Sequence, residues 1–223
     1  MRKFAISDIH GCLQTFEALL QQIQFSTKDE LYLLGDYIDR GPDSKGVIDL
    51  IWKMQEDGYQ IQCLRGNHEQ MLLNIINTPY HPLDRGDEQL LASFGVHHAQ
   101  NIPKPYLDWC AQLPYHFEVD NYILVHAGLN FGSTDPLQDT CSMMWIRNWR
   151  LEIDRNWLNG RIIVHGHTPT PKPAIQLYLE AADVTPEIII DNGCVYHGRH
   201  PDMGALIALE LSSRKMYWQE YEG

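Results

Sequence analysis

The sequence lacks three features that would each place it in a particular class of protein. No apolar run approaches the length of a signal peptide or of a membrane-spanning helix. Basic residues are few, with 17 Lys and Arg against 29 Asp and Glu, and the formal charge is −12. Because nucleic acids and anionic membranes are bound by basic patches, we expect no stable binding to either. Low-complexity tracts and internal repeats are also missing, which excludes repeat architectures.

The cysteines do not form a disulfide framework. The five of them are scattered, odd in number and free of any Cys-x-x-Cys pair. They therefore indicate reduced, mostly buried thiols in a reducing compartment. The chain also passes from Met1 directly into a strand pattern, without a recognisable targeting segment. Together these observations predict a cytoplasmic protein.

Three widespread catalytic motifs are missing as well. His68-Glu69 begins like the zinc-binding helix H-E-x-x-H, but Leu72 stands where the second histidine belongs. The chain has no Walker A loop and no G-x-S-x-G turn. The chemistry of zinc proteases, of P-loop nucleotide hydrolases and of serine α/β-hydrolases is therefore excluded.

The most informative stretch that is present runs from Leu31 to Gly41, L-Y-L-L-G-D-Y-I-D-R-G. Its four leading apolar residues predict a short buried strand, which ends by delivering Asp36, Asp39 and Arg40. Burying such charges unpaired would cost several kcal/mol each, so they must be paired, solvated or bound to metal. Since functional groups collect at the carboxyl edge of α/β sheets, Asp36 is predicted to be the centre of an active site.

The order strand, charged loop, helix occurs three times in the first half of the chain. It predicts βαβ units and a largely parallel sheet whose loops share one edge. We expect a single domain over 1–223, in which the proline-punctuated residues 78–113 form a cap or specificity region. The predicted strands cover 3–7, 31–34, 60–64, 115–119, 122–125, 161–164, 187–190, 204–211 and 215–221.

Five of these strands end in side chains that can bind metal ions. A lone strand-end aspartate is usually a turn former, and a lone histidine is more often a packed side chain than a ligand. Five such ends at the same edge are hard to explain in that way, because sheet geometry brings them together. The candidates are Asp8 and His10, Asp36, Asn67 and His68, His126, and His165 and His167.

The mixture of oxygen and imidazole ligands suits manganese, iron or zinc rather than calcium. The candidates are too many for one ion with an open position. Two divalent ions that share one bridging carboxylate fit better, and two-metal sites catalyse in-line displacement at phosphorus.

At this point the motifs show a family resemblance. D-I-H-G at 8–11, G-D-Y-I-D-R-G at 35–41 and R-G-N-H-E at 65–69 resemble the calcineurin-like metallophosphoesterases. H-A-G at 126–128 and G-H-T-P at 166–169 continue the match in the same order. Within that superfamily, the sequence is most similar to the compact bacterial and phage serine/threonine phosphoprotein phosphatases. The resemblance implies an α/β sandwich of two mixed β-sheets flanked by helices.

The resemblance also implies a division of roles among the site residues. A hydroxide between two metal ions, which we expect to be Mn with Fe or Zn as alternatives, would attack phosphorus in line. His68 would protonate the leaving oxygen and Asp39 would orient it, since a carboxylate beside an imidazole raises its pKa. Arg40 and Arg147, the latter in the W-I-R segment, would bind the phosphate oxygens. The implied metal ligands are Asp8, His10, Asp36, Asn67, His126 and His167.

Several residues near these motifs need separate interpretation. Pro169 stands where many relatives have a further histidine ligand, so the first metal would keep more water. His165 is interpreted as a strand-end histidine beside the site, with direct metal contact left open. Trp145 and Trp149, at a spacing of four, are expected to pack in the core, and Asp191 is expected to form a turn.

The sequence therefore predicts a two-metal phosphomonoesterase that acts on phosphoserine or phosphothreonine in proteins or peptides. The first alternative is a symmetrical bis(5'-nucleosyl)-tetraphosphatase or another small phosphoesterase of similar build. The second, from a different class, is a metal-binding scaffold without catalysis. A scaffold without catalysis would be expected to lack the general acid or the phosphate-binding arginine, whereas His68, Asp39 and Arg40 are all present.

Overall fold

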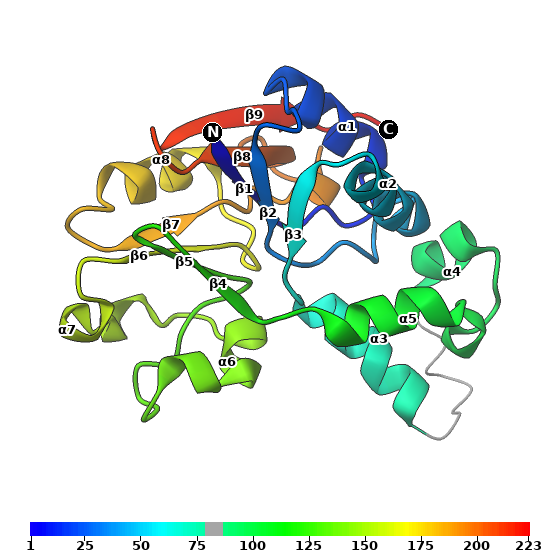
Figure 1. The fold of residues 1–223 in the computed structure, drawn as a ribbon, viewed down its shortest axis with the longest axis horizontal. Helices are drawn as coiled ribbons and strands as arrows, with labels where there is room; N and C mark the ends of the chain where they lie inside the picture. The colour runs from blue at the N-terminus through cyan, green and yellow to red at the C-terminus, as the bar shows by residue number, and fades with distance from the viewer. Residues whose placement is uncertain (79–86) are drawn as a thin grey trace.

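Two mixed β-sheets pack face to face in the structure, which is a computed structural model describing residues 1–78 and 87–223 (Figure 1). The first sheet has the order β3-β2-β1-β8-β9, and the second has the order β4-β5-β6-β7. The first comprises β1 (Lys3–Ile6), β2 (Glu30–Leu33), β3 (Gln60–Cys63), β8 (Ala205–Glu210) and β9 (Lys215–Glu220). The second comprises β4 (His116–Val119), β5 (Tyr122–Val125), β6 (Ile162–His165) and β7 (Glu187–Ile189).

Helices flank both sheets (Figure 1). They are α1 (Leu13–Gln22), α2 (Ser44–Glu56), α3 (Asn67–Asn77), α4 (Glu88–Phe94), α5 (Lys104–Gln112), α6 (Thr140–Trp145), α7 (Arg155–Leu158) and α8 (Lys172–Glu180). Short 3₁₀ helices cover Ala99–Asn101, Pro136–Gln138, Arg150–Glu152 and Cys194–Tyr196. The predicted α/β sandwich of two mixed sheets is thus confirmed.

Parallel pairing places several strand ends at one edge of each sheet. Strand β1 pairs in parallel with β2, and β2 with β3, while β8 and β9 are antiparallel. In the second sheet, β5, β6 and β7 are parallel and β4 is antiparallel to β5. The segments after β1, β2, β3, β5 and β6 therefore leave the sheets at their carboxyl edges, where functional groups collect in α/β folds.

Alternation along each strand sorts the apolar side chains into separate core layers, because successive residues point to opposite faces. In β1, Phe4 and Ile6 pack in the layer of the first sheet's flanking helices, whereas Ala5 packs between the two sheets. In β6, Val164 lies between the sheets and Ile163 lies on the outer face of the second sheet. These short strands are buried on both sides, which explains their almost continuous apolar sequences.

The local signals in the sequence account for some elements and not for others. The Asp43 carboxylate caps α2 by accepting a hydrogen bond of 2.7 Å from the backbone N–H of Gly46. Helix α8 was not predicted, although Pro171 and Pro173 bracket its first residue as expected for a helix start. The prediction for Trp145 was wrong: α6 ends at that residue and its side chain is 39% exposed, while Trp149 is buried on a separate segment.

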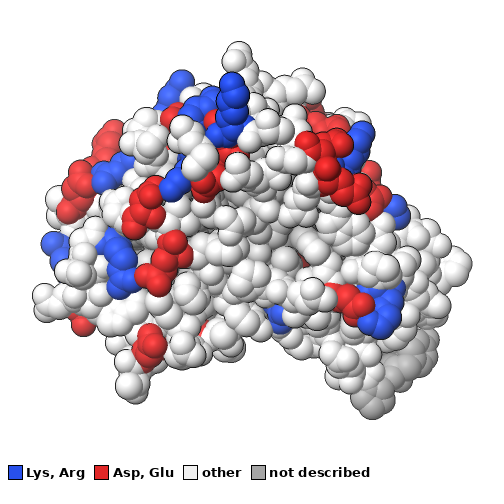
Figure 2. All heavy atoms as spheres, viewed as in Figure 1, with Lys and Arg blue, Asp and Glu red and all other residues white. Residues whose placement is uncertain are grey.

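The predicted cap region, 78–113, is described only in part, because 79–86 lie outside the described residues. Its described helices α4 and α5 lie beside α2 and α3, at the right of Figure 1. Opposite them, α6 lies below the second sheet, and the face in Figure 2 is hollowed between these two sides. Acidic and basic side chains are interspersed along the upper and outer parts of that face, whose middle is largely uncharged (Figure 2). Among the described helices, none is long and apolar enough to cross a membrane.

Candidate metal centre

Seven polar side chains from five separate segments meet at the carboxyl edges of the two sheets. Each segment directly follows a strand, or in one case forms the first turn of α3 after β3. All seven are at most 7% exposed, although each carries groups that would ordinarily stay in water. They are Asp8 and His10 after β1, Asp36 after β2, Asn67 and His68 at the start of α3, His126 after β5, and His167 after β6.

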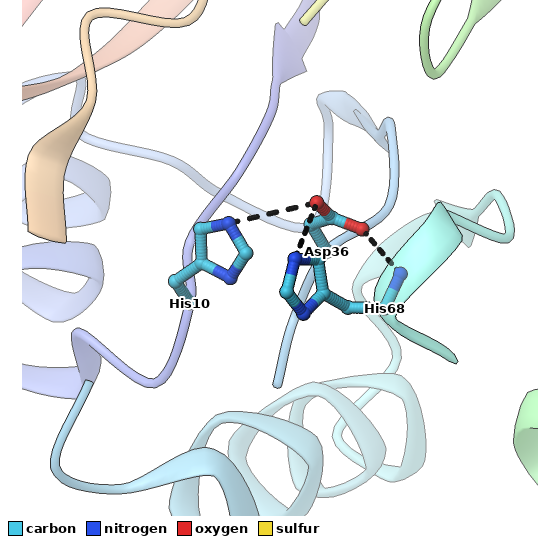
Figure 3. Close-up of side chains that lie close together, drawn as sticks. All are labelled: His10, Asp36 and His68. Carbon is cyan, nitrogen blue, oxygen red and sulfur yellow. Dashed lines mark hydrogen bonds and ion pairs between the residues drawn. The ribbon is translucent and has the colours of Figure 1, made fainter. Parts of the chain in front are cut away.

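Asp36 lies at the centre of this cluster. Its Oδ2 atom is 3.5 Å from His10 Nε2, 3.5 Å from His126 Nε2 and 3.9 Å from His68 Nε2. Figure 3 shows His10 and His68 directed at the same carboxylate from different elements. Two groups of candidate ligands share Asp36, one with His10 and His68 and the other with His126 and His167. A shared carboxylate is the arrangement that a bridged pair of ions requires.

The histidine hydrogen bonds fit a metal site. His10 Nδ1 lies 2.8 Å from the carbonyl oxygen of Ile38, and His126 Nδ1 lies 2.9 Å from that of Leu34. A carbonyl only accepts, so each Nδ1 carries the hydrogen and each Nε2 presents a lone pair. Those lone pairs face the Asp36 carboxylate, itself an acceptor, and a cation between them would satisfy both.

In the second ligand group, which contains His126 and His167, ring nitrogens also lie close to an oxygen atom and to each other. His126 Nε2 and His167 Nδ1 each lie 2.9 Å from Asn67 Oδ1, and they are 3.2 Å from each other. His167 Nε2 is buried without a hydrogen-bond partner among the described residues. Burial, followed by the charges of His126 and Arg147, lowers the pKa of His167 to about 3, which keeps the ring neutral and able to bind a cation.

The electrostatics of Asp36 also favour a bound cation. Burial raises the pKa of Asp36 well above its usual value, and the charges of Asp8 and Glu69 raise it further, against the opposing effect of His68. Burial, followed by the charges of His68 and Arg40, lowers the pKa of His10 well below its usual value. Divalent metals bind neutral imidazole and ionised carboxylate, and a bound cation would offset the cost of burying the charge of Asp36.

Asp8 lies at the edge of the two groups rather than within either. Its Oδ2 accepts a short hydrogen bond from the Ser7 hydroxyl and one of 2.9 Å from the backbone N–H of His167. It therefore ties the loop after β1 to the loop after β6. Its role as a ligand stays a prediction.

His68 and Asp39 form the pair that the resemblance implies. His68 Nδ1 is 2.5 Å from Asp39 Oδ2, so Nε2 is the nitrogen that faces Asp36 and the site. Burial by itself lowers the pKa of His68, but the hydrogen bond to Asp39 and the charges of Asp36 and Asp39 outweigh it and raise that pKa. A protonated, oriented imidazole suits a general acid, yet the same Nε2 also belongs to one candidate ligand group.

The two predicted phosphate-binding arginines border different ligand groups, Arg40 beside His10 and Arg147 beside His167. Arg40 Nη1 lies 2.7 Å from His10 Nε2, and its guanidinium lies over the Tyr196 ring at 5.5 Å from the centroid. Arg147 Nη1 donates a hydrogen bond of 3.0 Å to Thr168 Oγ1, next to His167. Both arginines are exposed residues bordering the buried cluster, so a phosphate group could contact either.

His165 does not join the cluster. It is the last residue of β6, and its parity with Ile163 directs it to the outer face of the second sheet. There Nε2 lies 3.1 Å from Glu187 Oε1, and the ring is 5.2 Å from that of Trp149. The Glu187 carboxylate, rather than a candidate metal ligand, is its partner.

Two acidic residues at the site have surroundings that the sequence motifs do not indicate, and Glu69 was not among the predicted site residues. Glu69 is fully buried, and it accepts hydrogen bonds from the backbone N–H groups of Asp36 (3.0 Å), Tyr37 (2.9 Å) and Gly66 (2.9 Å). Asp191 forms the expected turn, in which its Oδ1 accepts a hydrogen bond of 2.7 Å from the backbone N–H of Gly193, but it is also buried, and burial, followed by the charge of Asp8, raises its pKa well above its usual value. Both residues belong to short motifs in the sequence, Glu69 to R-G-N-H-E and Asp191 to the strand-end D-N-G. Only the three-dimensional structure shows which groups they contact.

Backbone strain is concentrated at the same place. Six non-glycine residues of the motifs have positive φ, namely Asp8, His10, Asp36, Asp39, Arg40 and His167. Such conformations are costly for residues other than glycine and persist where the surroundings fix them, typically at functional sites. Gly66 must be a glycine here, because a Cβ at that position would lie 2.2 Å from Asp36 Oδ1.

Glu69→Gln is expected to lower the free energy of unfolding of the metal-free protein by roughly 1–3 kcal/mol. The amide nitrogen that replaces one carboxylate oxygen would face a backbone N–H, which leaves a buried donor unpaired. The same change should reduce activity, because the Asp36 loop loses its anchor. Urea unfolding in the presence of a chelator measures the effect, with the exposed Glu17→Gln as the matched control. Equal midpoints for the two variants would contradict the anchoring role.

Comparison with known proteins places this geometry in a family. A profile of calcineurin-like phosphoesterases matches residues 1–204. A symmetrical bis(5'-nucleosyl)-tetraphosphatase of Chromobacterium violaceum is 36% identical over 132 residues, which cover 58% of this chain and 44% of that relative. The matched region thus spans less than half the length of the curated relative.

Solved structures agree on the fold. A candidate diadenosine tetraphosphatase superposes with a TM-score of 0.72 and 22% identity, over 100% of this chain and 95% of the other. A serine/threonine protein phosphatase from Saccharomyces cerevisiae gives a TM-score of 0.67 at 16% identity, over 100% and 81%. At these identities the likeness concerns the fold, and it does not separate the two activities.

Proposed function

Because this chain belongs to the calcineurin-like phosphoesterase family, we propose that it hydrolyses dinucleoside tetraphosphates symmetrically, at the central phosphoanhydride. The observation that carries the reaction class is the convergence of two ligand groups on Asp36, beside the His68–Asp39 pair. The substrate assignment is supported by the relatives, of which the Chromobacterium violaceum protein is named as a symmetrical tetraphosphatase. Because only part of that relative is matched, the activity of the whole protein is a proposal.

The candidate ligands can be assigned to two metal ions in the proposed reaction. Divalent ions at such a site neutralise phosphate charge and lower the pKa of a water molecule, which makes it nucleophilic near neutral pH. Asp36, His126, His167 and Asn67 would hold one ion, and Asp36 and His10, with Asp8 at the edge, the other. Manganese is the first ion to test, since the ligand types also accept iron or zinc.

The protein's own side chains supply the remaining steps. His68 donates its Nδ1–H to Asp39, and its raised pKa favours the doubly protonated ring, which can pass the proton on Nε2 to the leaving oxygen. Arg40 borders the site beside His10 and Arg147 borders it beside Thr168, where their guanidinium groups can bind phosphate oxygens. The cluster is buried, which strengthens each of these interactions by excluding water.

The prediction of a serine/threonine protein phosphatase remains the alternative. The motifs from which it came are present, and a fold shared with the yeast phosphatase is compatible with it. The curated relatives nevertheless favour the tetraphosphatase, which was the alternative in the sequence interpretation. The cytoplasm is the proposed location, in keeping with five free thiols.

The two activities are separated by one panel of assays. The metal-stripped protein is supplied with Mn²⁺, Fe²⁺ or Zn²⁺ in turn and tested on diadenosine tetraphosphate and on phosphoserine and phosphothreonine peptides. We expect metal-dependent conversion of the dinucleotide to ADP alone, at a kcat/KM at least about tenfold above that for any peptide, a margin of 1.4 kcal/mol. Hydrolysis of the peptides only would overturn the substrate assignment and restore the alternative. The absence of metal-dependent hydrolysis of either would overturn the reaction class.

A further inference from the structure

A pocket of about 290 Å³ opens on the outer face of the second sheet, beside the metal centre. Its walls come from the segment after α6, the loop after β6, strand β7 and helix α8. Its polar lining includes Arg147, Arg150, Thr168, Tyr178 and Glu187. None of these residues was singled out from the sequence except Arg147.

One end of this pocket reaches the candidate metal ligands. Thr168 directly follows His167, and it receives the hydrogen bond of 3.0 Å from Arg147 Nη1. Arg147 is also close enough to His167 for its charge to contribute to the low pKa of that histidine. A molecule bound between the metal centre and Arg147 would therefore extend directly into the pocket.

The pocket contains a second arginine that the reaction at the metal centre does not use. Arg150 lies over the Tyr178 ring at 3.9 Å from the centroid, and its Nε is 3.3 Å from Glu187 Oε2. The ring and the carboxylate fix the guanidinium on its inner side. Its terminal nitrogens make no hydrogen bond within the described residues, 1–78 and 87–223, and Arg150 is half-buried at the pocket wall.

Glu187 offsets only one of the two arginine charges that line the pocket. Its carboxylate is 5% exposed and is shared between Arg150 and His165, whose Nε2 is 3.1 Å from Oε1. Two arginines thus line a small cavity next to the metal centre, in a protein whose formal charge is −12. Positive charge gathered in one cavity of an acidic protein favours an anionic ligand there.

We propose that this pocket binds a second phosphate of the substrate, adjacent to the one at the metal centre, and that Arg150 is the residue that contacts it. The substrate class is then a phosphoanhydride, such as a nucleoside polyphosphate, rather than an isolated phosphate monoester. This proposal rests on the proposed phosphoesterase function and deepens it by assigning a residue to substrate selection.

The test compares AMP with ADP as inhibitors of p-nitrophenyl phosphate hydrolysis, at constant free Mn²⁺. The two nucleotides share the nucleoside and differ by one phosphate. We expect ADP to inhibit wild type about tenfold more strongly than AMP, since a hydrogen bond to a charged group has that effect. In Arg150→Gln the ratio should fall close to one. Arg150→Lys, which keeps the charge beside Glu187, should restore part of the ratio.

A matched control separates the pocket from the overall charge. Arg155→Gln removes one positive charge at a different cavity, lined by Asn121 and Asp183, and should keep the wild-type ratio. Equal inhibition of wild type by AMP and ADP would overturn the proposal, as would an unchanged ratio in a folded Arg150→Gln variant. Wild type that cleaves p-nitrophenyl phosphate but not diadenosine tetraphosphate would overturn the proposed substrate, while the ADP-to-AMP ratio would still decide the pocket.

Discussion

Asp36→Asn is expected to lower kcat/KM by about 10³-fold or more, while the metal-free protein becomes at least as stable as wild type. The loss of activity follows from the position of Asp36, which is shared by both ligand groups. The stability change follows from its pKa, which burial and the charges of Asp8 and Glu69 raise. A raised pKa means that the ionised carboxylate is less stable in the folded than in the unfolded protein, so ionised Asp36 destabilises the metal-free fold near neutral pH. Asparagine has the same shape, and it can still accept the 3.0 Å hydrogen bond from His68 N–H.

Thermal unfolding with chelator measures the stability of the metal-free variants, and thermal unfolding with Mn²⁺ measures their stabilisation by the metal. Added Mn²⁺ should raise the Tm of wild type, because a ligand that binds only the folded state stabilises it, and should have much less effect on Asp36→Asn. The exposed Asp57→Asn, at the end of α2, is the matched control and should follow wild type in both conditions. Equal stabilisation of wild type and Asp36→Asn by the metal would contradict the bridging position of this carboxylate.

The second large effect is expected for His68→Asn, with a decrease in kcat of about 10²–10⁴-fold on a substrate with an alkoxide leaving group. The reason is the orientation of the ring: Asp39 holds Nδ1 at 2.5 Å and leaves Nε2 to face the site. On p-nitrophenyl phosphate the decrease should be much smaller, because p-nitrophenoxide leaves without protonation. Steady-state kinetics on the two leaving groups measures the difference, and His97→Asn, at an exposed position of the described chain, is the control.

The same variant distinguishes the two roles that the geometry allows for His68. Its Nε2 lies 3.9 Å from Asp36 Oδ2 and belongs to the first ligand group, so it could bind an ion instead of donating a proton. If His68 is the general acid, His68→Asn should leave the bound metal content unchanged, and the decrease in kcat should depend on the leaving group. A lower metal content, with equal losses on both substrates, would make His68 a ligand. Full activity on the alkyl substrate would exclude both roles.

Much of the site could be predicted from the sequence for a simple physical reason. A short apolar strand followed by charged residues has few other uses, and parallel strands bring their carboxyl ends together. Asp36, His126 and His167 are far apart in the chain, yet the structure places them in one ligand group as that reasoning requires. The Asp43 cap of α2 likewise rests on local chemistry alone, since its carboxylate reaches a backbone N–H three residues away.

Other features depend on contacts that no local pattern contains. Trp145 and Trp149 have the spacing of helical neighbours, but α6 ends at Trp145, so Trp149 lies on a separate segment; the first is exposed and the second is buried. His165 resembles the strand-end ligands, but the alternation of β6 turns it toward Glu187. Local sequence records the type of a side chain and its periodicity, and it does not record which distant group that side chain meets.

The sequence by itself indicated a phosphoesterase, because the strand-end motifs place candidate metal ligands and a candidate acid in the order that the family resemblance implies. It also determined the α/β architecture, because strand and helix periodicities alternate. Only the tertiary structure decided that Glu69 anchors the Asp36 loop and that Arg150 lines a pocket beside the metal centre. Those roles depend on segments far apart in the chain coming within hydrogen-bonding distance, which follows from the packing of the two sheets and their helices.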